Sequence, residues 1–160
     1  MSQFEWVSLP DTDSAEGGVP GGPAWFRAAT PGSVHRDAVA GTLAMHFAPG
    51  RWLLVGPRTA TLALVDALSA TVGGVGADVT GKYAAIPLRG QSAGPTLASA
   101  LNVAAVLPAG RQCAAAMPFD CPAVVVREED GFTVWVASSH VRDFTVATER
   151  AASVCEKMTG

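Results

Sequence analysis

The clearest chemical motif in the sequence runs from Gly90 to Gly94 (GQSAG) and fits the G-x-S-x-G pattern. In that pattern a serine lies at a sharp strand-to-helix turn, where its hydroxyl is presented for nucleophilic attack. Asp120 or Asp130, and then His140, follow Ser92 along the chain. An acid and a histidine follow the serine in this order in α/β-hydrolases. These residues therefore permit a serine esterase that uses Ser92, Asp130 and His140.

The residues around the motif favour a structural role instead. A nucleophile elbow ends a central parallel strand, and such strands are almost continuously apolar. The segment Tyr83 to Arg89 alternates, and its Pro87 is typical of an edge strand. Pro95 then opens a helix that carries Leu97 and Leu101 one turn apart. We therefore expect a strand-turn-helix corner and assign no catalytic residue to the chain.

The histidines and cysteines give no metal-ligand pattern. His35, His46 and His140 lie far apart, and neither Cys113 nor Cys121 has a partner at CxxC or HxxxH spacing. Structural and catalytic zinc sites draw their ligands from such short spacings. The sequence therefore predicts no metal site.

The cysteines also indicate the compartment. Three cysteines at irregular spacings suit a reducing cytoplasm better than a disulfide framework, so we expect a cytoplasmic protein. Cys121 lies in a loop and is expected to be the most exposed thiol, whereas Cys155 falls on the apolar stripe of the last helix and is expected in the core. The glycines between Gly73 and Gly76 lack a following Lys-Ser/Thr and helix, which favours a flexible link over a phosphate-binding loop.

Composition excludes two classes of partner. The net charge is −3 and there is no Lys/Arg-rich run, so nucleic-acid binding is not expected. No apolar run approaches the length of a membrane span, and the first residues do not form a secretory signal. Hydrophobic residues make up 49% of the chain and charged residues 16%. This balance favours a packed domain with extensive contacts to partner chains.

Hydrophobic periodicity predicts both strands and helices. The expected strands are Thr42 to Phe47, Arg51 to Val55, Tyr83 to Arg89, Arg111 to Met117, Ala123 to Arg127 and Phe132 to Ala137, with helices from Pro57, from Pro95 and from Ser138 or Ser139. Asn102 is expected to cap the end of the second helix. The irregular order and the hairpins predict an α+β fold of mostly antiparallel sheet, with helices on one face and split β-α-β, ferredoxin-like halves.

The N-terminal part has a different composition. Asp11 to Pro23 is rich in Gly, Pro, Asp and Ser, which predicts a loop. We therefore divide the chain into an irregular arm and loop, residues 1–40, and a single α+β domain, residues 41–160. Aromatic residues that could dock on a partner are Trp6, Trp25, Phe26, Trp52 and Trp135.

Several short segments carry a resemblance to a known family. They are Pro49 to Pro57 (PGRWLLVGP), Ala77 to Thr80 (ADVT), Ile86 to Gly90 (IPLRG) with Gly94, Pro95 and Leu97, and Val134 to Val136 (VWV) before the last helix. Over roughly Leu43 to Ala152 the chain resembles the gamma subunit of heterotetrameric sarcosine oxidase. That subunit is itself similar to the folate-binding aminomethyltransferase, or glycine-cleavage T-protein, superfamily.

The resemblance implies an accessory chain of a flavoenzyme that oxidatively demethylates sarcosine or a similar N-methyl amino acid. It implies partner alpha, beta and delta subunits, with FAD, FMN, NAD, tetrahydrofolate and zinc held by those partners and no cofactor bound by this chain alone. Folate-binding relatives carry a Gly-Gly and paired acids where this sequence has Met117 to Pro122 (MPFDCP). A stand-alone folate-binding module therefore stays an alternative, as does the serine esterase.

Overall fold

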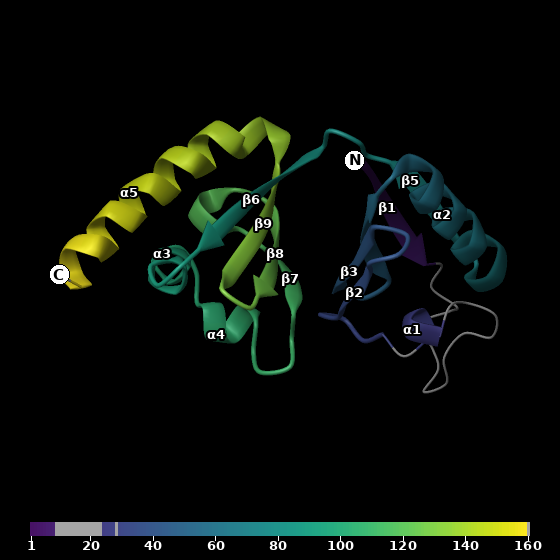
Figure 1. Cartoon of the computed structure of the whole chain (residues 1–160), viewed down its shortest axis with the longest axis horizontal. Coiled ribbons are helices and arrows are strands. Elements are labelled where there is room, and N and C mark those ends of the chain that lie inside the picture. Colours follow the sequence, from purple (N-terminus) through teal and green to yellow (C-terminus); the bar gives the residue numbers. More distant parts are fainter. Residues whose placement is uncertain (9–23, 28, 160) are drawn as a thin grey trace. The chain divides into compact units, whose positions relative to one another are not determined.

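The computed structural model describes residues 1–8, 24–27 and 29–159. These residues form two compact units, Met1–Gly81 and Lys82–Gly160, each built from an antiparallel sheet with helices on one face (Figure 1). The expected α+β class, with mostly antiparallel sheet, is confirmed. The loop expected over Asp11 to Pro23 lies outside the described residues.

The first unit holds a five-stranded sheet in the order β2-β3-β4-β1-β5. Its elements are β1 (Ser2–Ser8), α1 (Ala24–Arg27), β2 (Val34–Asp37), β3 (Thr42–Ala48), β4 (Arg51–Gly56), α2 (Arg58–Val72) and β5 (Gly74–Asp78). Alternate residues of β1 and β4, including Trp6 and Leu54, face a core that also contains Val65 and Leu68 of α2. Burying these side chains joins the helix to one face of the sheet.

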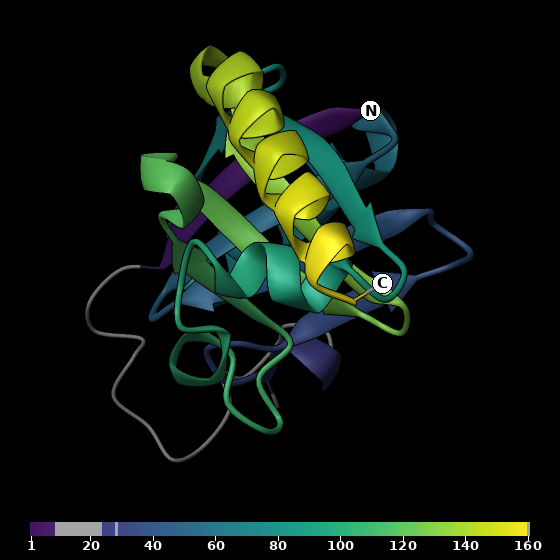
Figure 2. The ribbon, with the colours of Figure 1, turned by 90° about the vertical axis from the view of Figure 1, so that its left-hand side faces the viewer.

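The second unit holds a four-stranded sheet in the order β6-β9-β8-β7. Its elements are β6 (Tyr83–Arg89), α3 (Ala93–Ala98), α4 (Val103–Val106), β7 (Cys113–Ala116), β8 (Ala123–Glu128), β9 (Gly131–Ala137) and α5 (Val141–Thr159), with 3₁₀ turns at Pro118–Asp120 and Ser138–His140. Figure 2 shows α5 crossing the sheet face with α3 beside its C-terminal part. Phe144 of α5 and Leu97 of α3 are fully buried in the core beneath them.

The predicted domain division is wrong for the N-terminal residues. Instead of an irregular arm over residues 1–40, β1 pairs with both β4 and β5 inside the first sheet. Trp6 in this strand is 0% exposed. The structure also divides the expected single domain of residues 41–160 between Gly81 and Lys82. The physical reason is that the first forty residues supply strands to the same sheet as β3 and β4.

The glycine-rich segment after α2 is a strand and not the expected flexible link. In β5, Gly74 and Gly76 pair with β1 opposite Ser8 and Trp6. A Cβ at Gly74 would lie 2.3 Å from Cζ2 of Trp6, and one at Gly76 would lie 2.3 Å from Cγ1 of Val65. The glycines are therefore needed because the core packs against their backbone.

The end of the second predicted helix is also corrected. Asn102 does not cap the C-terminus of α3 but the N-terminus of α4, where its Oδ1 accepts a hydrogen bond from the Ala105 N–H at 3.2 Å. Asparagine favours this position because its side-chain oxygen satisfies an otherwise unpaired amide of the first turn.

Candidate functional site

The GQSAG segment is the predicted strand-turn-helix corner. It follows β6, and Gly90 adopts a φ of +80°, a left-handed conformation that favours glycine. The Gly90 N–H donates to the Asp130 carbonyl at 3.1 Å, and the Ser92 carbonyl accepts from the Thr96 N–H at 2.9 Å as α3 begins. Ser92 stands at the N-cap position, but its hydroxyl caps no amide. The start of α3 therefore forms without a capping hydrogen bond from the Ser92 hydroxyl.

The register of the strands separates the residues of the candidate triad. Arg89 pairs with Gly131 and Tyr83 pairs with Ala137, so Ser92 and His140 follow opposite ends of the same ladder. The seven residues of β9 span roughly 20 Å at about 3.3 Å per residue. A serine and its general base must come within hydrogen-bonding distance. The structure therefore does not bring Ser92 and His140 together.

Asp130 lies at the Ser92 end of this ladder, where it has a structural partner. Its carboxylate forms an ion pair with Nε of Arg89 at 3.2 Å. The same guanidinium donates from Nη2 to Oγ1 of Thr133 at 3.1 Å, and the Thr133 hydroxyl donates to Glu128 at 3.0 Å. This network joins β6 to the β8-β9 hairpin. Asp120, the other candidate acid, precedes Ala123, which pairs with Val136 near the His140 end.

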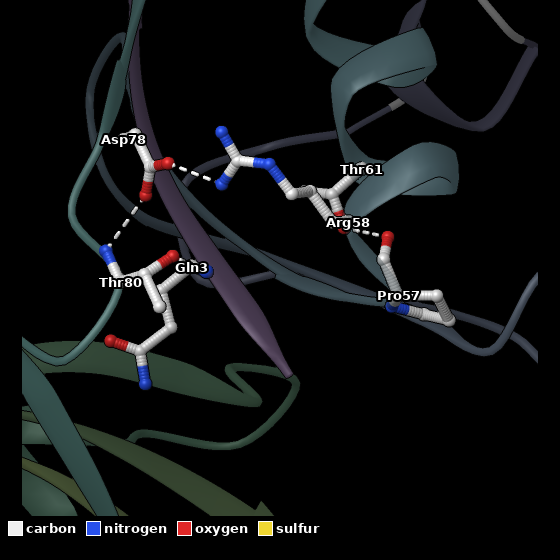
Figure 3. A network of polar contacts seen from close by, with 6 residues as sticks. All are labelled: Gln3, Pro57, Arg58, Thr61, Asp78 and Thr80. Carbon is white, nitrogen blue, oxygen red and sulfur yellow. Dashed lines mark hydrogen bonds and ion pairs between the residues drawn. The ribbon is translucent and has the colours of Figure 1, made fainter.

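A second polar network lies in the first unit (Figure 3). Arg58, at the start of α2, donates from Nη1 to Oδ2 of Asp78 at 2.6 Å, and the Thr80 N–H donates to Oδ1 of Asp78 at 3.0 Å. The Thr80 hydroxyl accepts from the Gln3 N–H at 3.1 Å. Because the hydroxyl and N–H of Thr80 and the Arg58 guanidinium stabilise the carboxylate, the pKa of Asp78 falls from 3.8 to about 2. The network ties α2, β1 and the end of β5 together.

The sequence reasoning missed this network as a structural unit. Its signal was the Asp78-Val79-Thr80 spacing, because an Asp side chain often accepts a hydrogen bond from the N–H two residues later. The partners Gln3 and Arg58 lie far away in the sequence. The pairing of β1 with β5 places Gln3, and the packing of α2 against these strands places Arg58.

The cysteines differ from the expected order of exposure. Cys121 is buried, 2% exposed, and not the most exposed thiol; its Sγ–H donates to the Phe119 carbonyl at 3.3 Å. Burial, with smaller contributions from Asp143 and Asp120, raises the pKa of this thiol. Burial raises the pKa of Cys113 to about 12. Such thiols are poor nucleophiles because the reactive species is the thiolate.

The aromatic residues expected to dock on a partner are mostly core residues. Trp6, Phe26, Trp52 and Trp135 are buried, and only Trp25 of this set is half-buried. In the first unit Phe26 stacks on Trp52 with ring centroids 4.7 Å apart, and Trp6 meets Phe26 edge-on at 5.4 Å. The predicted role of these side chains in docking is therefore corrected to one in packing.

Two histidines belong to the same aromatic cluster. The ring of His46 stacks on Trp52 with centroids 4.2 Å apart, and the ring of His35 stacks on Trp25 at 4.3 Å. The backbone of His46 is hydrogen-bonded in the sheet region, with its N–H donating to the Ser33 carbonyl at 3.0 Å. Across the described part of the chain, no group of three or more His, Cys, Asp or Glu residues is placed to hold a metal ion.

A pocket of about 260 Å³ lies in the second unit between the start of α3 and the C-terminal part of α5. Its lining residues are Gln91, Ser92, Pro95, Cys155 and Glu156. Cys155 was expected in the core, but it is half-buried at this pocket. The sequence could not indicate the pocket, because its two sides come from segments about sixty residues apart that meet only in the fold. No helix within the described ranges is long and apolar enough to cross a membrane.

The structure is similar to a chain of the heterotetrameric sarcosine oxidase from Corynebacterium sp. U-96, solved in complex with pyrrole 2-carboxylate. The TM-score is 0.66, the sequence identity is 21%, and the match covers 96% of this chain and 80% of that chain. The two chains share a fold. The predicted resemblance to sarcosine oxidase is thus confirmed in three dimensions, over both units. No protein-family model and no curated protein matches the sequence.

Proposed function

We propose that the chain is a non-catalytic accessory subunit of a heterotetrameric sarcosine oxidase-like flavoenzyme, which oxidatively demethylates sarcosine or a similar N-methyl amino acid. The observation that carries the proposal is the shared fold over 96% of the chain with a chain of such an oxidase. A shared fold alone does not transfer an activity, so the proposal also rests on what the side chains do in this chain.

The candidate reactive groups have structural partners or stand apart. Asp130 is engaged by Arg89, His140 follows the opposite end of the strand ladder from Ser92, and Cys113 and Cys121 are buried thiols with raised pKa values. This distribution fits a chain that contributes packing and contact surface to an assembly.

We propose that this chain itself holds no flavin, nicotinamide or folate cofactor. The pocket between α3 and α5, about 260 Å³, is smaller than the ~300–1,000 Å³ typical of sites for drug-sized ligands. The glycine-rich segment at Gly74 is strand β5 and presents no phosphate-binding loop before a helix. We therefore propose that FAD, FMN, NAD and tetrahydrofolate, as well as zinc, belong to the partner alpha, beta and delta subunits.

Co-expression tests the proposal. An affinity-tagged copy of this chain is expressed with its candidate flavoprotein partners, and the purified material is analysed for stoichiometric partner chains and bound flavin. We expect a complex that oxidises an N-methyl amino acid, while the chain alone does not. A chain that purifies alone under these conditions as a stable monomer would contradict the accessory role, and tetrahydrofolate binding by that monomer would favour the folate module instead.

A further inference from the structure

Strand β5 forms one edge of the five-stranded sheet, and part of its backbone points outward. It pairs with β1 on one side, and no described strand pairs with its other side. The Val79 N–H donates to the carbonyl of Gln3, the residue opposite it, at 2.8 Å. Such bonds recur at every second residue of an antiparallel ladder, so Val75 bonds to β1, whereas Gly74 and Gly76 direct their N–H and C=O groups outward. The edge thus presents backbone donors and acceptors in the arrangement that an added strand requires.

The other described sheet edges carry features that discourage strand pairing, and β5 does not. Proteins commonly protect sheet edges with charged side chains, with proline or with very short strands. Strand β2 carries Arg36 and has four residues, β6 carries Pro87, and β7 has four residues. Strand β5 contains no lysine, arginine or proline. Its single charged residue, Asp78, is bound to Arg58 and Thr80 of the same unit (Figure 3). Among these edges, β5 is therefore the one best suited to accept another strand.

An exposed apolar pair lies beside this edge. Val75 of β5 is directly opposite Val7 of β1, and their side chains are 65% and 45% exposed. The pair lies on the face away from α2, because a Cβ at neighbouring Gly76 would meet Val65 of that helix and side chains alternate along a strand. A strand added at β5 would place a side chain next to Val75 at a non-hydrogen-bonded position, where cross-strand side chains come closest. Aliphatic and aromatic residues form the favourable pairs at such a position.

We propose that β5 accepts an extended segment of a partner subunit as a sixth strand of the sheet, with an aliphatic or aromatic residue next to Val75. Main-chain hydrogen bonds then hold the segment, and the side chain next to Val75 adds specificity. The inference rests on the subunit role proposed above and names a contact that serves it.

The size of the edge favours a partner subunit over a second copy of this chain. A five-residue ladder is only about 17 Å long, whereas stable interfaces bury ~1,200–2,000 Å². A dimer held by this edge alone would dissociate, because one short ladder supplies too little contact. In a heterotetramer the same ladder adds to the wider contacts of the chain with its partners.

Hydrogen exchange read by electron-transfer mass spectrometry tests the contact. The full chain is compared alone and in the complex co-purified with its candidate flavoprotein partners. In the isolated chain, the outward amides of Gly74 and Gly76 should exchange fast and the inward amide of Val75 slowly. In the complex we expect slower exchange at Gly74 and Gly76, and no change in β2 at the opposite edge of the sheet.

The outcomes separate this inference from the subunit role. Unchanged exchange over β5 in a complex that forms would overturn the inference and leave the subunit role intact. Failure of the wild-type chain to bind any partner would remove both.

Two matched variants test the exposed pair. Val75→Lys places a charge where the added strand must pack, and it should weaken association about fivefold, the upper range for a cross-strand pair. Val39→Lys makes the same change at a fully exposed site between β2 and β3, at the other end of the strand order, and should bind as the wild type does. Each variant competes with differently tagged wild type for the same co-expressed partners, and mass spectrometry gives the ratio of the two chains in the complex. Circular dichroism verifies that each variant is folded. Equal ratios for folded Val75→Lys and Val39→Lys would contradict strand addition at β5.

The alternative occupant is a second copy of the chain, and light scattering after size-exclusion chromatography distinguishes it. Expressed without partners, the wild-type chain is expected to be a monomer. A dimer that Val75→Lys abolishes would overturn the choice of a partner subunit as the occupant.

Discussion

The packing of Trp6 against β5 predicts that Gly74→Ala is strongly destabilising. An ideal Cβ at position 74 would lie 2.3 Å from Cζ2 and 2.7 Å from Cε2 of Trp6, and 2.7 Å from the Val7 carbonyl oxygen. Neither obstacle can move easily. Trp6 is 0% exposed, its Nε1–H donates to Ser69 at 3.3 Å, and the carbonyl belongs to a paired strand.

The magnitude follows from the kind of clash. Extra methyl groups in a packed core cost about 1–3 kcal/mol, and the rigid surroundings of Gly74 place this substitution at about 2–3 kcal/mol. Gly94→Ala is the matched control. Its Cβ would meet nothing within 4 Å, and Gly94 lies in α3 without a positive φ. Alanine there should be close to neutral, because the lower entropy of the unfolded chain is offset by crowding between the new Cβ and the ring of Pro95.

The assay is urea unfolding of the full chain, followed by far-UV circular dichroism and tryptophan fluorescence. Three of the four tryptophans lie in the first unit, so fluorescence reports mainly on the unit that contains Gly74. Trp6→Phe should relieve part of the cost of Gly74→Ala, because the smaller ring vacates the position of Cζ2. A loss below about 0.5 kcal/mol in Gly74→Ala, or no coupling to Trp6 in the double-mutant cycle, would refute the packing argument.

The remaining predictions concern charge, thiols and the serine. Because the pKa of folded Asp78 is about 2, below its ordinary value of 3.8, its contribution to stability is present above pH 4 and is lost as the pH falls towards 2. The difference in the free energy of unfolding between wild type and Asp78→Asn, measured by urea unfolding at each pH, should therefore shrink over this range. A difference that stays constant would contradict the network. Ellman's reagent should modify Cys155 first in the folded protein, with Cys113 and Cys121 reacting only in urea; fast reaction of all three thiols would contradict their burial. Ser92→Ala should leave any hydrolysis of p-nitrophenyl acetate by the isolated chain unchanged, and a rate that depends on Ser92 would contradict the separation of Ser92 from His140 by the strand register.

The elements with strong local periodicity could be predicted from the sequence. The alternation of Tyr83 to Arg89 matched β6 in both bounds, and the three- and four-residue spacing around Phe144 matched α5. The corner at Ser92 was also predicted, because Pro87 and Pro95 are local signals that do not depend on distant partners. Such segments carry their structural information within a few residues.

The features that depend on distant partners could not be predicted. Strand β1 looked like part of an arm because its partners β4 and β5 lie some fifty to seventy residues away. Cys121 appeared exposed in a loop, but Phe119, at a φ of +52°, packs its ring against Phe144 and holds that loop on the core. The pocket beside Glu156 forms only because α5 packs against α3, which lies about sixty residues earlier in the chain. These contacts are set by tertiary packing, which a local pattern does not encode.

The accessory-subunit role is tested most directly by native mass spectrometry of the tagged chain after co-expression with its candidate flavoprotein partners. The account predicts a heterotetramer that contains one copy of this chain and carries flavin mass on the partner subunits. A spectrum that shows only the free 160-residue chain, with the partners folded and flavin-loaded in the unbound fraction, would contradict it.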